Sequence, residues 1–324
     1  MDQQEGARRI IRNCIGIKPE ERVLLITDER RPPAVEQALY EACREVGVIP
    51  ERVCFDGILN QGQPPETIAA AMERADVVLC ITTNTLGYSM ATRACTQRGG
   101  RVVAMTEATE ELLTNGALEA DFSGLRGRVR FVMEAFDRAE EVRVTTRKGT
   151  ELTFRIGGRM SHCCMGTCLE PGIMAAVPDM GVYIAPVEGT MDGIWIADVM
   201  GTGMGLLTEP IRLEIQNGEA RAITGGDQAN QLRQRVENVP GGKVVAEFAI
   251  GLNPCATPTG SIVIDEGIYG TGHFALGSNT GFGGNNSCTQ HLDLVYEKPT
   301  IYLDGNLFME DGVLIESCGS IQSK

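Results

Sequence analysis

Two of the three histidines in this 324-residue chain, His273 and His291, flank the glycine-rich segment SNTGFGGNNS, and Asp293 follows His291 by two positions. The segment QHLDLVYE has the pattern of a β-strand, in which side chains two positions apart point to the same face. His291 and Asp293 can therefore chelate one cation from one strand face. With His273 they give two histidines and one carboxylate, a ligand set typical of non-haem Fe(II) sites with open positions. The glycine-rich segment is expected to bring the two histidines together.

Two further acids stand close to this pattern. Glu247 lies within VVAEFAI, and a charged side chain inside an apolar strand is costly unless it is paired or metal-bound. Glu266, in IDEGIYG, precedes His273 by seven positions. Ordinary alternatives exist, because an HxD pair on a strand is often a surface ion pair and a single histidine often only satisfies a hydrogen bond in the core. The spacing alone leaves both interpretations open.

The elements that would position these residues fall into two parts. In residues 1–140 strand-like and helix-like segments alternate, which indicates an α/β domain with a parallel sheet covered by helices. The strand-like segments are RVLLIT, VIPERVCF, ADVVLCITT and RVVAMT, and the helix-like ones are PPAVEQALYEACREVG, PETIAAAMERA and MATRACTQRGG. No GxGxxG follows the first strand, so the domain is Rossmann-like without a dinucleotide motif. It is expected to be a scaffold or a dimerisation layer.

Residues 141–324 show a different pattern, typical of a mainly antiparallel α+β domain, and they hold the candidate metal site. Apolar alternation surrounds three dipeptides that tolerate the positive φ of tight hairpin turns, namely Asn217-Gly218, Asp304-Gly305 and Asp311-Gly312. The clearest helix in this part is GGDQANQLRQRVENV. We therefore expect a catalytic domain over 141–324, with a boundary near residue 140.

Charge and composition exclude several classes of protein. A net charge of −14 disfavours nucleic acid and anionic membrane surfaces, because both repel an acidic protein. No apolar run approaches the ~18 residues of a membrane helix, and no signal peptide is visible, so a cytoplasmic protein is expected.

Eleven cysteines, an odd number, indicate reduced thiols. In SHCCMGTC, Cys163, Cys164 and Cys168 lack the second cluster of a zinc site and are expected to pack or to be incidental. His162 is expected in a loop.

A resemblance to a known family rests on motifs that occur in the same order in this chain and in the members of that family. The motifs that carry the resemblance are, in order, PDMGVYIAPVEGTMDG, AEFAIGLNP, DEGIYGTGHFALG and NNSCTQHLDLV. Through them the chain resembles the leucyl-aminopeptidase-like metallopeptidases exemplified by aminopeptidases T and S, and their relative 2,5-dihydroxypyridine 5,6-dioxygenase. The resemblance covers nearly the whole chain and implies a divalent metal and a homodimer. It places the family's metal-binding glutamate at Glu247, its HxALG histidine at His273, and its final HxD pair at His291 and Asp293.

The chain departs from the peptidase pattern at two positions. Gly181 stands where the peptidases have a glutamate that helps to hold a second metal, and the nearest acids are Asp179 and Glu188. Thr280 stands where the peptidases have a tyrosine. Both differences disfavour a paired-metal peptidase, in which two cations activate water and hold the carbonyl. The two histidines and one aspartate that remain are the set that the related dioxygenase uses for one iron.

The preferred hypothesis is a mononuclear Fe(II) dioxygenase that opens the ring of a small hydroxylated N-heterocycle or related aromatic. The alternative is a metallo-aminopeptidase or amidohydrolase with Zn or Co, in which Glu247 is a metal ligand and Glu266 is the general base that activates water. A third hypothesis is a metal-free binding protein that keeps the fold. The substrate itself is not specified, because its recognition depends on the shape of the pocket.

Overall fold

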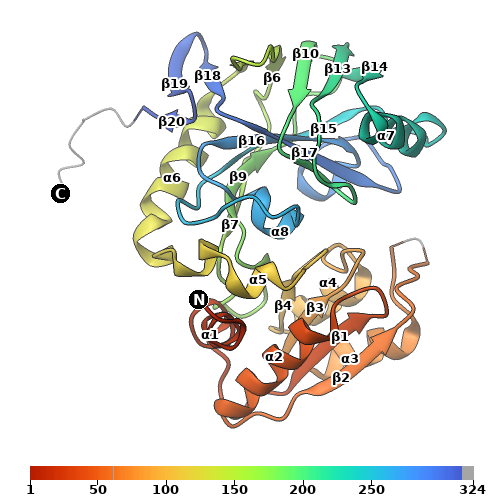
Figure 1. Cartoon of the computed structure of the whole chain (residues 1–324), viewed down its shortest axis with the longest axis vertical. Coiled ribbons are helices and arrows are strands. Elements are labelled where there is room, and N and C mark those ends of the chain that lie inside the picture. The colour runs from red at the N-terminus through yellow and green to blue at the C-terminus, as the bar shows by residue number, and fades with distance from the viewer. Residues whose placement is uncertain (61, 316–324) are drawn as a thin grey trace.

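The computed structural model describes residues 1–60 and 62–315, arranged as two stacked bodies (Figure 1). The lower body, in red and orange, holds a parallel sheet between helices. The upper body, from yellow-green to blue, holds two antiparallel sheets. This is the predicted combination of a parallel α/β part followed by a mainly antiparallel α+β part.

The parallel sheet has the strand order β2-β1-β3-β4-β8. Its first four strands are β1 (Val23–Asp28), β2 (Glu51–Phe55), β3 (Val77–Ile81) and β4 (Arg101–Ala104). The helices between them are α2 (Pro33–Glu45), α3 (Glu66–Arg74) and α4 (Met90–Gln97). Every residue of β3 is buried, because helices cover both faces of the sheet. The predicted alternation of strands and helices in this part is confirmed.

The fifth strand of this sheet comes from later in the chain. Strand β8 (Met174–Ala176) pairs in parallel with β4. The parallel sheet therefore takes residues from both sides of position 140, where the sequence predicts a domain boundary. That boundary stays a prediction.

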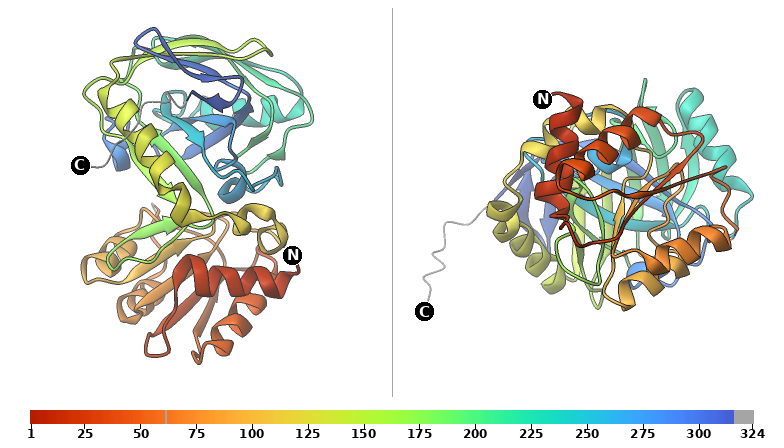
Figure 2. Two further views of the ribbon diagram at one scale, coloured as in Figure 1. Left: turned by 90° about the vertical axis from the view of Figure 1, so that its left-hand side faces the viewer. Right: turned by 90° about the horizontal axis from the view of Figure 1, so that it is seen from below.

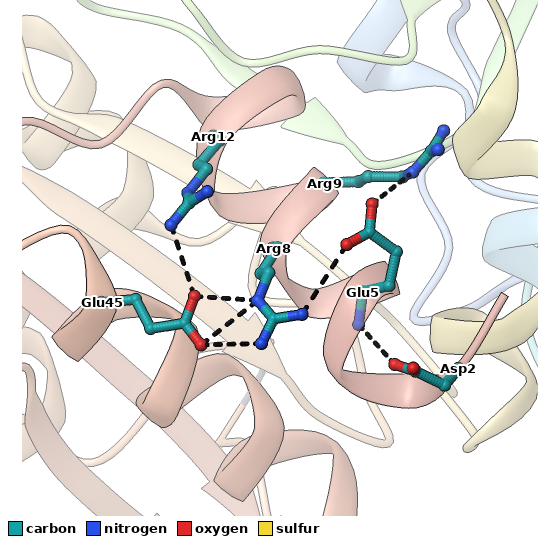
Figure 3. A network of polar contacts seen from close by, with 6 residues as sticks. All are labelled: Asp2, Glu5, Arg8, Arg9, Arg12 and Glu45. Atoms are coloured by element: carbon teal, nitrogen blue, oxygen red, sulfur yellow. Dashed lines mark hydrogen bonds and ion pairs between the residues drawn. The ribbon is translucent and has the colours of Figure 1, made fainter.

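The N-terminal helix packs tightly against the lower body. Helix α1 (Gln3–Arg9) continues as the π-helical turn η1 (Ile10–Ile15). A Cβ atom at Gly6 would lie 1.8 Å from the Leu113 carbonyl oxygen, so glycine is required where α1 meets α5 (Glu111–Thr114). On the outer side, Glu45 of α2 accepts hydrogen bonds from Arg8 at 2.9 Å and Arg12 at 3.3 Å (Figure 3). These charges are partly exposed, so they contribute little to stability compared with the buried apolar side.

The upper body contains two antiparallel sheets. The eight-stranded sheet has, in order, β14 (Glu219–Thr224), β13 (Ile211–Gln216), β10 (Asp192–Ala197), β6 (Glu151–Arg155), β5 (Glu141–Thr145), β18 (Thr300–Leu303), β19 (Asn306–Glu310) and β20 (Val313–Leu314). The seven-stranded sheet has β12 (Gly205–Leu206), β11 (Met200–Gly201), β17 (His291–Glu297), β16 (Thr271–Gly277), β15 (Val245–Gly251), β9 (Met180–Ile184) and β7 (His162–Met165). The left view of Figure 2 shows this body above the parallel-sheet body.

Four helical segments accompany these sheets: α6 (Phe122–Arg138), α7 (Asp227–Glu237), α8 (Ile262–Asp265) and the 3-10 turn η3 (Thr280–Phe282). Helix α7 is the one that the sequence predicts. Helix α8 lies on the side of the upper body that faces the parallel sheet (Figure 1). The three predicted hairpin dipeptides all have positive φ at both positions, for example 51° at Asn217 and 73° at Gly218.

The core of the upper body lies between its two sheets. Trp195 of the eight-stranded sheet is fully buried and packs edge-on against Phe274 of the seven-stranded sheet, with ring centroids 5.3 Å apart. Phe154 packs in the same way against Phe248 at 5.1 Å. One face of the seven-stranded sheet is therefore occupied by the core, and its other face is free to carry polar side chains. No helix within residues 1–60 and 62–315 has the length and apolar character to cross a bilayer.

Candidate metal centre

The predicted site residues lie on one face of three neighbouring strands. Glu247 of β15 pairs with Ala275 of β16, and Ala275 pairs with Asp293 of β17. Directly paired residues point to the same face, so the two carboxylates flank Ala275. His273 is two positions from Ala275 on β16, and His291 is two positions from Asp293 on β17. Because residues two positions apart on a strand point to the same face, both imidazoles lie on the face that carries the two carboxylates.

Small residues keep the space between these side chains open. Ala275 lies between the two carboxylates, and Ala249 pairs with His273. Gly277 pairs with His291, and a Cβ atom there would lie 2.2 Å from the Gln290 carbonyl oxygen. Gly277 also has φ of 118°, which L-residues rarely adopt. The tight approach of β16 to the glycine-rich loop therefore needs this glycine.

The four polar side chains come within contact distance of one another. Glu247 Oε1 lies 3.3 Å from His273 Nε2, and Glu247 Oε2 lies 3.1 Å from His291 Nε2. His291 Nε2 is also 3.2 Å from Asp293 Oδ1. In the part of the chain that the structure describes, Glu247, His273 and Asp293 are the one set of three potential ligand residues whose donor atoms all lie within 4.8 Å.

A β-bulge helps to orient Glu247. The pairing of β15 with β16 shifts between Val245 and Glu247, so that Val245 pairs with Leu276 and Glu247 with Ala275. Such an extra residue changes the local twist and the direction of the neighbouring side chain. Here it occurs immediately before the only charged residue of β15, whose seven residues are all buried.

The electrostatics of this cluster suit a cation. Burial alone would raise the pKa of Glu247, but hydrogen bonds with His273 and His291 hold it at about 2. Burial would lower the pKa of His291, whereas Asp293 and Glu247 raise it well above its ordinary value. The carboxylates thus favour positive charge at this point. A divalent ion can supply that charge in place of the imidazole protons.

The orientation of each imidazole also fits metal binding. His291 Nδ1 lies 2.8 Å from the Ser278 carbonyl oxygen. Because a carbonyl only accepts, Nδ1 must carry the proton, which leaves the Nε2 lone pair of the neutral ring for a cation. His273 Nδ1 is buried and has no hydrogen-bond partner among the described residues. The other nitrogen of this ring, Nε2, lies 3.3 Å from Glu247 Oε1, so the ring edge that faces the carboxylates is the one that can bind a metal.

Besides the contact between His291 and Ser278, a network of polar side chains holds the glycine-rich loop. Asn279, fully buried, donates to Glu188 Oε1 at 3.0 Å, and Asn286 donates to the Gly277 carbonyl at 2.6 Å. Glu188 is also paired with Arg159. Glu188, one of the two acids nearest to Gly181 in the sequence, is therefore engaged in fixing this loop.

Asp179 and Glu266 form the acidic edge of the site. Burial raises the pKa of Asp179 to about 6. Burial also raises the pKa of Glu266 well above its ordinary value, and the nearby Asp179, Asp293 and Glu247 add to this effect. Glu266 follows α8 directly and is partly buried. Without a metal, both carboxyl groups therefore hold protons more strongly than ordinary acids do.

An aromatic wall stands beside the cluster. His162 of β7 pairs with Tyr183 of β9, which pairs with Ala249 of β15, so the row of side chains continues to His273. The His162 and Tyr183 rings stack with centroids 5.5 Å apart, and Phe282 lies edge-on to Tyr183 at 5.5 Å. The prediction that His162 lies in a loop is wrong. All three histidines of the chain share one face of one sheet.

Cysteines also lie near the site. Cys164 of β7 pairs with Gly181, and Asp179 forms a hydrogen bond with its thiol. Burial raises the pKa of the Cys164 thiol well above its ordinary value, so it is a poor thiolate ligand. Cys168 is fully buried and packs in the core, as predicted for this group.

The lower body contributes to the surroundings of the site. Tyr88, in the loop after β3, contacts the glycine-rich loop, since a Cβ atom at Gly281 would lie 3.7 Å from its ring. Glu107, in the loop after β4, accepts a hydrogen bond from the backbone N–H of Gly203 at 3.2 Å. The loops at the carboxyl ends of parallel strands thus reach the metal-binding face, where ligand sites of such sheets commonly lie.

Comparison with known proteins identifies the family. A sequence profile of the 2,5-dihydroxypyridine 5,6-dioxygenase family matches residues 5–316. The chain belongs to this family. It is 27% identical over 248 residues to the 2,5-dihydroxypyridine 5,6-dioxygenase of Pseudomonas putida KT2440, an alignment that covers 72% of this chain and 69% of the relative. A chain of this dioxygenase family is an enzyme, and the dioxygenase class that the sequence favours is confirmed.

Two solved structures share the fold over almost the full length. The 2,5-dihydroxypyridine dioxygenase of Pseudomonas putida KT2440 matches with a TM-score of 0.78 at 20% identity, covering 97% of both chains. AmpT from Thermus thermophilus matches with a TM-score of 0.69 at 15% identity, covering 97% of this chain and 98% of the other. At these identities the structural similarity supports the fold, and the chemistry has to be inferred from the residues of the site.

Several residues around the site carry no sequence signal of their own. Tyr183 and Phe282 lie within PDMGVYIAPVEGTMDG and SNTGFGGNNS, but nothing in these motifs marks either ring as part of the site, and the position of Tyr183 depends on the order β7-β9-β15 of the sheet. Glu107 lies in the part of the chain that the sequence assigns to a scaffold. Alternation along PDMGVYIAP could have placed Tyr183 on a polar face, but not beside His273.

Proposed function

We propose that this enzyme is an Fe(II)-dependent dioxygenase that opens the ring of a small hydroxylated N-heteroaromatic compound. The observation that supports this most is the buried cluster of imidazoles and carboxylates on one sheet face, in a chain of the 2,5-dihydroxypyridine 5,6-dioxygenase family. A ring carbon–carbon bond would break, and both oxygen atoms of O₂ would enter the product.

In this proposal His273, His291 and Asp293 hold one metal ion, whereas the set whose donor atoms all lie within 4.8 Å contains Glu247 in place of His291. Glu247, which contacts both imidazoles, would be either a fourth ligand or the hydrogen-bond partner that orients them. When bound, Fe(II) supplies electron transfer between an electron-rich ring and dioxygen, and two histidines with one carboxylate leave positions open for both.

The chain's own residues would bind and orient the substrate. Tyr183 and Phe282 offer ring faces and edges against which a planar heterocycle can pack. Burial of Glu247, His273 and Asp293, each at most 8% exposed, excludes bulk water from the reacting atoms. Burial raises the pKa of Glu266, and in its protonated form Glu266 can donate a hydrogen bond or a proton to a substrate oxygen.

The alternative, a metallo-aminopeptidase with Zn or Co, keeps one observation in its favour. Asp179 and Glu266 supply further carboxyl groups beside the cluster, where a second cation would bind. As a general base, however, Glu266 must be ionised, and burial among other acids opposes that. Gly181 adds no ligand, because its position on β9 lacks a side chain.

Metal analysis after anaerobic purification tests the proposal, followed by oxygen uptake with a panel of hydroxylated pyridines. We expect about one iron per chain and O₂ consumption that depends on it. Two zinc or cobalt ions per chain, with release of amino acids from short peptides, would establish the peptidase instead. A chain that binds no divalent cation even after reconstitution would favour the binding protein.

We also propose that the enzyme is a homodimer, which the family resemblance suggests. Three of the apolar residues that are more than two-thirds exposed, Ile49, Ile58 and Met90, belong to the lower body, and a fourth, Met160, belongs to the upper body. Light scattering at micromolar concentration tests this, and a monomer mass alone would contradict it.

A further inference from the structure

Thr202, in the turn after β11, forms hydrogen bonds with both the backbone and the side chain of Asp293. The Thr202 hydroxyl accepts a hydrogen bond from the Asp293 backbone N–H at 3.0 Å and donates one to Asp293 Oδ2 at 3.3 Å. The Thr202 backbone N–H donates to the Asp293 carbonyl at 2.9 Å. Three hydrogen bonds therefore join these two residues, and one of them reaches the carboxylate itself.

This arrangement distinguishes the two oxygens of the carboxylate. Oδ2 is held by Thr202, whereas Oδ1 lies 3.2 Å from His291 Nε2 and faces the rest of the cluster. A carboxylate without such a bond could rotate about its Cβ–Cγ bond and exchange the two oxygens. The Thr202 hydroxyl thus determines which oxygen is presented to the site.

The turn itself is held from both bodies. The Thr202 carbonyl accepts a hydrogen bond from Arg235 of α7. The next residue, Gly203, donates its N–H to Glu107 Oε2 at 3.2 Å. Glu107 belongs to the lower body, which otherwise provides no residue that contacts this turn among the hydrogen bonds of the described chain.

Glu107 has an unusual backbone that serves a second contact. Its φ is 56°, a left-handed conformation that is uncommon for a residue other than glycine, asparagine or aspartate. In this conformation its N–H donates to the Thr82 carbonyl at 3.0 Å. Its carbonyl accepts a hydrogen bond from Ser261 Oγ at 3.1 Å, and Ser261 precedes α8, which Glu266 follows directly.

We propose that Thr202 and Glu107 are positioning residues of the metal centre. Thr202 fixes the Asp293 carboxylate, and Glu107 fixes both the 202–203 turn and the start of α8 from the parallel-sheet body. The lower body is then part of the site and not only a scaffold. This inference rests on the proposed metal site, because it concerns a ligand of that site.

Thr150 offers a matched control for Thr202. Its hydroxyl accepts from the Ile196 N–H at 3.0 Å and donates to the Ile196 carbonyl at 3.3 Å, and its side chain is buried, whereas that of Thr202 is partly buried. The pair lies in the eight-stranded sheet and touches no site residue. Replacing either threonine by valine therefore removes a comparable pair of hydrogen bonds, but only Thr202→Val changes the surroundings of Asp293.

The experiment measures Co(II) affinity by chelator competition, with the Co(II) absorption spectrum as a report on the ligands. We expect Thr202→Val to bind Co(II) about 10–100-fold more weakly, the range of mutations that disturb the hydrogen bonds of metal ligands. Thr202→Ser, which keeps the hydroxyl, should recover most of the affinity. Thr150→Val should lower thermal stability but leave affinity and spectrum unchanged.

Glu107 is tested separately, so that the proposal remains testable if Thr202→Val fails to fold. Glu107→Ala loses the acceptor for the Gly203 N–H and should weaken Co(II) binding, whereas Glu107→Gln keeps an acceptor and should bind nearly normally. Folded Thr202→Val or Glu107→Ala with wild-type affinity and spectrum would overturn the role of that residue. If the wild-type protein binds no Co(II), the metal site fails instead, so the two failures can be told apart.

Discussion

Adjacent residues on β17 provide a sharp test, because they point to opposite faces of the sheet. Leu292 is 2% exposed and faces the core between the two sheets, whereas Asp293 is 8% exposed and faces the metal-binding side. We compare Leu292→Ala with Asp293→Asn. The first removes packing without touching the site, and the second removes one negative charge at nearly constant volume.

The expected magnitudes differ in kind. Truncation of a fully buried leucine costs roughly 2–5 kcal/mol of the free energy of unfolding, through lost burial and the cavity left behind. Loss of the Asp293 charge removes an anionic ligand, so metal affinity should fall by more than the 10–100-fold that changes around a ligand cause. His273→Ala should lower metal affinity by a similar factor, although His273 lies on the neighbouring strand, 20 positions before Asp293 in the sequence.

The assay combines metal content after dialysis against a weak chelator with urea unfolding of the metal-free proteins. Leu292→Ala should unfold at lower urea and keep full metal. Asp293→Asn should unfold near the wild-type midpoint and lose metal. The reasoning is refuted if Asp293→Asn keeps full metal while Leu292→Ala loses it.

Three further predictions follow from the same face of the sheet. Glu247→Gln should leave about one ion per chain in a one-metal site, whereas a drop by about one ion in metal analysis would indicate a paired-metal site. Ala275→Leu should fill the space between the two carboxylates, so metal content should fall, while over-packing costs only about 1–3 kcal/mol of stability by urea unfolding; retained metal would contradict this geometry. Asp179 has a pKa of about 6 in the folded protein against an ordinary 3.8, so the folded state binds this proton more tightly than the unfolded state does. The resulting contribution to the free energy of unfolding is fully present below pH 3.8 and is lost as the pH rises through about 6. Asp179→Asn should therefore stabilise the metal-free protein by up to about 3 kcal/mol at pH 7.5 and hardly at pH 4, and an effect independent of pH would refute the assignment.

Local chemistry made part of the fold and site predictable from the sequence. Asn217-Gly218 marks a hairpin because both residues must adopt positive φ, and the structure shows this. Period two in QHLDLVYE places His291 and Asp293 on one face without knowledge of the partner strands. The alternation of apolar strands and amphipathic helices before residue 140 likewise reports a parallel sheet directly.

The remaining features depend on contacts between distant segments, which no local pattern encodes. Strand β8 joins the parallel sheet because a short segment that begins at Met174 pairs with β4 at the edge of the sheet. Tyr183 reaches the site only because β9 lies between β7 and β15, and the bulge before Glu247 follows from packing against β16. Glu107 contacts the turn behind Asp293 only because the two bodies stack.

The most direct test of the account follows the oxygen atoms. Iron-loaded protein is supplied anaerobically with each compound of the hydroxylated pyridine panel, 2,5-dihydroxypyridine included, and then with ¹⁸O₂, and the products are analysed by mass spectrometry, with the His273→Ala variant as the control. We predict an open-chain product that contains both labelled oxygen atoms, formed with equimolar uptake of O₂ and absent with the variant. An intact ring without oxygen uptake across the hydroxylated pyridine panel, while the same iron-loaded protein releases amino acids from peptides, would contradict the account.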